Sequence, residues 1–124
     1  MTPLATATPT TPGAVLTKAT LRAAKHLGLT DAALGAIIGI SGASVSRLGV
    51  GRRAIAPGDK EGQLAVLFLR MYRSLDALLG DAESCRRWLH AENGHLGQVP
   101  AGLIRSVEGL VHVTQYLDAM RGKN

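Results

Sequence analysis

Cys85, His90 and His95 follow one another closely in the sequence, and their side chains could carry out thiol, acid–base or metal chemistry. Zinc sites favour closely spaced pairs such as CxxC or HxxxH, whereas these three residues follow one another at intervals of five. A nucleophilic thiol–imidazole pair is also disfavoured, because residues at that interval diverge on a helix. The spacing therefore predicts no catalytic residue, no metal site and no cofactor, and a small enzyme is the weakest interpretation of the chain.

Phosphate binding is the chemistry that the arginines and lysines offer. Residues 1–60 carry seven Lys or Arg and two Asp, whereas residues 61–124 carry seven cations and seven acids, so the formal net charge of +5 lies in the first half. Clustered cations bind nucleic-acid phosphates through counterion release. Aromatic residues make up only 3% of the chain, which argues against single-stranded nucleic acids that stack on aromatic rings. The charge distribution predicts that the first half binds double-stranded DNA.

The stretch at residues 31–50 has the spacing of a helix-turn-helix. Gly35 is small enough to let two short helices cross closely, and Gly39 tolerates the positive φ that a tight corner requires. Ser41 is expected to cap the second helix. The apolar positions that would hold the second helix on the first are Ile40, Val45 and Leu48. An ordinary helical hairpin with a solvated basic face is the alternative, but the motif coincides with the net charge, which favours DNA binding.

The face of the second helix that would enter a DNA groove carries small residues, and Arg47 is its only long side chain. One arginine can bind a guanine with two hydrogen bonds, and little else on this face distinguishes bases strongly. Sequence-specific binding by one copy would therefore be weak, which predicts a homodimer or a larger assembly on the operator. The predicted DNA-binding residues are Ser41, Ala43, Ser44, Ser46, Arg47, Arg52 and Arg53.

Apolar residues recur at helical spacing along the chain and no useful strand alternation occurs, so the expected fold is all-α. Helices are expected at residues 16–27, from 31 to the Gly39 corner, and at 42–48, 60–79, 82–91, 100–104 and 107–120. The chain then divides into a flexible tail (1–13), a helix-turn-helix domain with a long connecting helix (14–74) and a small helical domain (75–124).

Several features of the sequence bear on its compartment. The single cysteine fits a reducing cytosol, and the N-terminus lacks the basic and apolar regions of a signal peptide. The longest apolar run, residues 64–69, is far too short to span a membrane. The sequence therefore predicts a soluble cytoplasmic protein with no membrane partner.

The second half contains an ordered series of short motifs: W-L, a loop with H-L-G, P-x-x-L-I, S-x-E-G and V-x-x-x-L. The positions that carry the series are Trp88, Leu89, Leu96, Gly97, Pro100, Leu103, Ile104, Gly109, Val113 and Leu117. In this order they resemble the toxin-binding domain of Xre/MbcA/ParS-type antitoxins over residues 75–124. The helix-turn-helix upstream completes the two-part layout of that family.

The resemblance implies a type II antitoxin that binds and inhibits a partner toxin, commonly an NAD-degrading RES toxin, and represses its own operon. In this family the C-terminal end approaches the active-site pocket of the toxin. The implied toxin-binding residues are Trp88, Pro100, Leu103, Arg121, Gly122, Lys123 and Asn124. Packing inside its own domain is the favoured alternative for Trp88, and a frayed end is the alternative for the last four residues. A stand-alone transcription regulator whose second half only dimerises is the alternative function.

Overall fold

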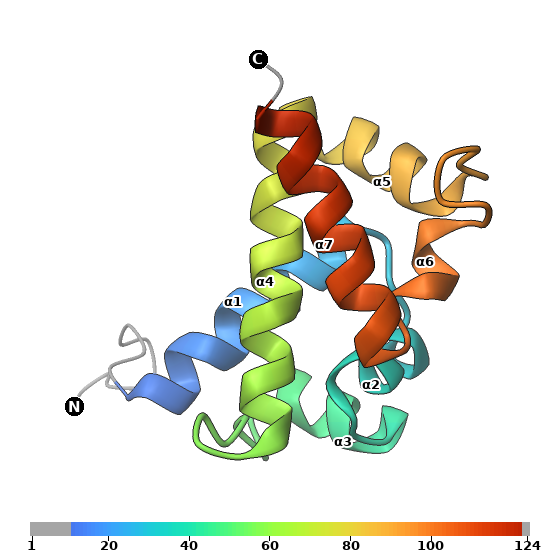
Figure 1. Ribbon diagram of the computed structural model, residues 1–124. Helices are drawn as coiled ribbons and strands as arrows, with labels where there is room; N and C mark the ends of the chain where they lie inside the picture. The colour runs from blue at the N-terminus through green and yellow to red at the C-terminus, as the bar shows by residue number, and fades with distance from the viewer. Residues whose placement is uncertain (1–10, 123–124) are drawn as a thin grey trace.

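The structure, a computed structural model, describes residues 11–122, and this part of the chain contains seven helices and no β-strand (Figure 1). The helices are α1 (Pro12–His26), α2 (Asp31–Ile38), α3 (Gly42–Gly49), α4 (Lys60–Leu79), α5 (Ala82–His90), α6 (Pro100–Leu103) and α7 (Val107–Gly122). An isolated β-bridge between Asn93 and Gln98 closes the turn that follows α5. The expected all-α fold is confirmed.

Helix α1 begins four residues earlier than the sequence analysis expects. Thr11 caps it, because the Thr11 hydroxyl accepts the Ala14 N–H at 3.2 Å, and Pro12 takes the first helical position, where its missing N–H costs nothing. Pro12 and Gly13 therefore belong to α1 and not to a tail. The rest of the predicted tail, residues 1–10, lies outside the described residues.

One cluster of buried side chains joins the two halves of the chain. Helices α4 and α7 lie side by side and run in the same direction (Figure 1), linked by a hydrogen bond from Ser74 to Asp118. The large buried side chains of these two helices are Phe68, Met71, Leu75, Leu110, Val113 and Leu117. They belong to the same core as Leu34, Ile38 and Val45 of the helix-turn-helix. The predicted boundary at residue 74/75 falls inside α4.

A second contact between the halves joins the end of α1 to α5 and α4. The Nε2–H of His90 donates to the carbonyl of Leu27 at 2.8 Å, and Arg86 Nη1 donates to the carbonyl of His26 at 3.2 Å. The His26 ring is itself hydrogen-bonded to the Tyr72 hydroxyl at 2.8 Å. The orphan carbonyls at the C-terminal end of α1 thus find partners in the second half of the chain.

Among the described residues, no single helix is long and apolar enough to cross a membrane. Helices α2 and α3 reach the length and apolar composition of a membrane span only when they are counted together, and the chain bends by 107° between them.

Candidate nucleic-acid and protein interfaces

The α2–α3 pair has the geometry of a helix-turn-helix. The two axes differ by 107°, and a three-residue turn, 39–41, joins them. Gly39 adopts a φ of 81° in the left-handed region. A β-carbon on Gly35 would overlap the carbonyl oxygen of Ile40, so only glycine lets the turn approach α2 this closely. The sequence-based roles of both glycines are confirmed.

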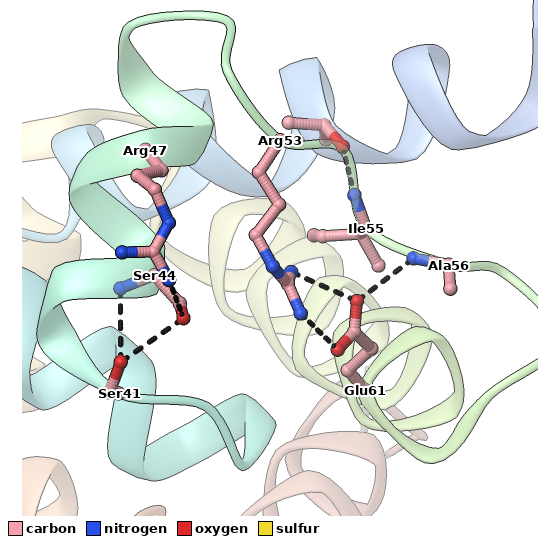
Figure 2. Close-up of polar contacts among 8 residues, drawn as sticks. Ser41, Ser44, Arg47, Arg53, Ile55, Ala56 and Glu61 are labelled. Carbon is pink, nitrogen blue, oxygen red and sulfur yellow. Dashed lines mark hydrogen bonds and ion pairs between the residues drawn. The ribbon is translucent and has the colours of Figure 1, made fainter.

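Helix α3 turns its apolar side inward and leaves its polar side exposed. Val45 and Leu48 are buried, whereas Ala43, Ser46 and Arg47 are exposed. The Ser41 hydroxyl caps the helix by accepting the Ser44 N–H at 3.0 Å, as Figure 2 shows. The exposed side of α3 is the side that the sequence analysis predicts to contact DNA.

The guanidinium of Arg53, one of the predicted DNA-binding residues, is paired with Glu61 in this structure (Figure 2). Nη1 donates to Oε2 at 3.0 Å and Nη2 donates to Oε1 at 2.7 Å. The Ala56 N–H also donates to Oε2 at 2.9 Å, and the Thr17 hydroxyl accepts the Ile55 N–H at 2.8 Å. Arg53 thus helps to fix the segment between α3 and α4 onto α4, and the Ile55 bond fixes the same segment onto α1. We therefore propose a structural role for Arg53 in place of a DNA contact.

The Arg53–Glu61 pair also changes the protonation of Glu61. The hydrogen bonds from the Arg53 guanidinium lower the pKa of this carboxyl below its ordinary value, although its partial burial acts in the opposite direction. The side chain of Glu61 is 13% exposed and that of Arg53 is 29% exposed, so solvent only partly screens the pair.

The neighbouring Arg52 is exposed and serves as a direct test of the revised DNA surface. Arg52→Gln should weaken DNA binding and lower the slope of log K against log salt by about one, because one phosphate contact is lost. Arg53→Gln should instead lower the Tm by about 5 °C, because the ion pair with Glu61 is broken. Fluorescence anisotropy of a labelled duplex at several salt concentrations, with thermal unfolding, separates the two. Equal losses of DNA affinity at unchanged Tm would return Arg53 to the DNA surface.

Cys85, His90 and His95 lie in different surroundings. Cys85 is buried in the core, and its burial raises the pKa of the thiol. His90 is bonded to the Leu27 carbonyl, and His95 is exposed in the turn after α5. Within residues 11–122, no group of three or more His, Cys, Asp or Glu side chains could hold a metal ion.

Three aromatic rings gather on the surface of the second half. Trp88 of α5 stacks on Tyr116 of α7, with centroids 6.4 Å apart and planes 18° apart. The ring of His95, in the turn after α5, has its centroid 6.1 Å from that of Tyr116. Trp88 is half-buried and also packs against the core, so part of its surface remains for a partner. Sequence analysis missed Tyr116, because its position 28 residues after Trp88 gives no local sign of the stack.

The structure places the other residues implied by the resemblance in different surroundings. Pro100 is buried at the start of α6, which leaves it a structural role, and Leu103 is half-buried against the core. Arg121 lies inside α7, which extends through Gly122 and not only to Met120. Lys123 and Asn124 lie outside the described residues.

A hydrogen-bond network fastens the end of α7 to α4. The Ser74 hydroxyl donates to Asp118 Oδ1 at 2.6 Å, and Arg70 Nη2 donates to Oδ2 at 2.8 Å. Arg121 Nη1 donates to the Ser74 hydroxyl at 3.1 Å. The hydrogen bond from Ser74, and after it the bond from Arg70, lowers the pKa of the Asp118 carboxyl. The chain therefore leaves α7 from a fixed point.

Two family models match the chain in succession. The antitoxin Xre-like helix-turn-helix domain matches residues 7–70, which include all of α1 to α3. The antitoxin Xre/MbcA/ParS C-terminal toxin-binding domain matches residues 74–123. The chain is an antitoxin of this family. The two domain matches of the antitoxin meet inside α4, the helix that both halves pack against.

A solved structure supports the same assignment for the whole antitoxin. A chain of the crystal structure of the M. tuberculosis MbcT-MbcA toxin-antitoxin complex is 28% identical to it and superimposes with a TM-score of 0.63. The match covers 86% of the antitoxin and 93% of that chain, so the likeness extends across both halves. The comparison with curated proteins gave no match.

Proposed function

We propose that this antitoxin binds and inhibits a cognate toxin and represses its own operon. The toxin is of the NAD-degrading RES type, and the C-terminal domain with its terminal segment covers the toxin active site. The observations that carry the proposal are the likeness to a chain of a toxin–antitoxin complex, 93% of which is covered, and the toxin-binding domain match at residues 74–123. Inhibition by contact requires surface complementarity and no catalytic group or cofactor.

The DNA-binding part of the proposal rests on the exposed side of α3. Ser41, Ala43, Ser44, Ser46 and Arg47 line or flank this side, and Arg52 follows it. Only one long side chain on the helix can distinguish bases, so we propose that two copies act together on the operator. Operator DNA and toxin would both be met in the cytoplasm.

The C-terminal segment provides the test of toxin inhibition. Removing residues 122–124 leaves Arg121 and its bond to Ser74 in place, so the fold should be retained. Cells that produce the toxin from the adjoining gene should then stop growing, and their NAD level should fall, when the shortened antitoxin replaces the unshortened antitoxin. Growth curves and cellular NAD measure the effect. Removal of residues 2–6, which precede both family matches, is the matched control and should leave inhibition intact.

The outcomes separate the possible functions. Full protection by the shortened antitoxin would mean that the terminal segment is not used, and the surface around Trp88 and Tyr116 would then carry inhibition alone. If the complete antitoxin neither protects cells nor co-purifies with the adjoining gene product, yet binds its operator as a dimer, it is a stand-alone regulator.

A further inference from the structure

The Arg47 side chain does not extend freely into solvent but is held along α3. Its Nη2 donates to the Ser44 hydroxyl at 2.9 Å, and the Ser41 hydroxyl donates to the same oxygen at 3.1 Å. Figure 2 shows the three side chains connected in this order on one side of the helix. The guanidinium is therefore directed toward the N-terminal end of α3, where helix-turn-helix proteins contact base edges.

Ser44 uses two different groups for two different purposes. Its backbone N–H donates to the Ser41 hydroxyl at 3.0 Å and completes the helix cap. Its own hydroxyl accepts the bonds from Arg47 and Ser41 and contributes nothing to that cap. The hydroxyl can therefore be removed while the cap remains.

The surroundings of Arg47 make its orientation matter. The other exposed side chains of α3 are short, so Arg47 is the one group on this helix that can reach a base from a distance. Its planar fork matches the O6 and N7 acceptors that guanine presents in the major groove. A side chain that is already ordered loses less conformational entropy when it binds. The affinity for the correct site is therefore higher.

We propose that Ser44 is a positioning residue that holds Arg47 ready to bind one guanine in each operator half-site through the major groove. This inference rests on the proposed DNA-binding function. It predicts that the hydroxyl at position 44 affects the choice of sequence and not the general attraction to phosphate.

The experiment begins with wild-type antitoxin and a pool of random DNA duplexes, from which the preferred site is selected. The guanine of that site is then replaced by 7-deazaguanine, which lacks the N7 acceptor, or by inosine, which lacks only the minor-groove amino group. Wild-type affinity should fall with 7-deazaguanine and be unchanged with inosine. Loss with inosine alone would place the contact in the minor groove and overturn the proposal.

Substitutions at position 44 complete the test. Ser44→Ala should lose about three- to tenfold affinity for the selected site, with unchanged affinity for random duplex and unchanged salt dependence. Ser44→Thr restores a hydroxyl and should recover most of the loss. Gln115→Ala is the control, because Gln115 is an exposed polar residue of α7, outside the proposed DNA surface, with no side-chain hydrogen bond among the described residues.

Other results would contradict the positioning role. Equal losses on selected and random DNA would mean that Ser44 supports the fold or contacts phosphate. Unchanged selectivity of Ser44→Ala, with wild-type selectivity intact, would overturn the role of Ser44 alone. If wild-type antitoxin binds neither the pool nor its own promoter, the proposed DNA-binding function itself fails.

Discussion

Gly109→Ala should lower the free energy of unfolding of the antitoxin by about 3 kcal/mol, among the largest effects of any single methyl group in this chain. Gly109 is buried in the first turn of α7, and a β-carbon there would overlap the carbonyl oxygen of Leu103 at the end of α6. The obstacle is backbone and cannot rotate away as a side chain would. The α6–α7 corner would have to open, and Leu110 next to it would lose its packing in the core.

Gly102→Ala is the matched control for this prediction. Gly102 lies in α6, and a β-carbon there would meet open space. Its replacement should therefore raise the free energy of unfolding slightly, by up to about 1 kcal/mol, because alanine restricts the unfolded chain more than glycine does. Urea unfolding followed by circular dichroism measures both variants. Similar stabilities of the two variants would show that α6 and α7 can separate at little cost.

Glu61→Ala should lower the free energy of unfolding by about 2 kcal/mol. The Glu61 carboxylate accepts two bonds from Arg53 and one from the Ala56 N–H, so its removal leaves three donors of a half-buried site without their partner. We expect the segment between α3 and α4 to loosen, which hydrogen exchange at Ile55 and Ala56 would detect. Unchanged exchange there would contradict the role that we give to the pair.

Two carboxyl groups, those of Glu61 and Asp118, make the stability of the antitoxin depend on pH. The pKa values of Glu61 and Asp118 are both lowered in the folded antitoxin, by bonds from Arg53 and from Ser74 respectively. A lowered carboxyl pKa contributes stability that is fully present above the unfolded value, about 4 for these groups, and is lost as the pH falls through the folded value. Wild-type stability should thus decline below about pH 5. Glu61→Gln should decline less steeply, whereas Glu92→Gln, at an exposed turn position, should follow the wild type.

Features that depend on neighbouring residues were predictable from the sequence. Gly35, Gly39 and Ser41 act within a few positions of themselves, as small contact, turn and cap, and the structure places all three in those roles. Thr30 likewise caps α2 by accepting the Ala33 N–H at 3.1 Å. The start of α1 was missed although its signal is also local, because the Thr11–Pro12 cap is embedded in a stretch rich in threonine and proline.

Features that depend on tertiary contacts were not predictable. Arg53 looks like a DNA-binding cation in a basic, glycine-rich segment, and only the folded segment brings Glu61 within 2.7 Å of it. Pro100 has the sequence signal of a helix start, but the sequence does not show that the folded chain buries it. Arg121 looks like part of a free tail, yet Ser74 of α4 draws it into the last turn of α7. The partner of Arg121 is 47 residues away in sequence, and Arg53 reaches Glu61 only because the segment between them folds back.

The core shared by the two halves has a consequence for the lifetime of the antitoxin. Because α4 and α7 pack in one cluster with the helix-turn-helix, we expect each half to lose its structure when the other is lost. Unfolding is then a single event, and a protease that captures the unfolded chain removes both halves together. On the proposed function, release of the toxin and reopening of the operon would begin at the same moment and proceed at the same rate.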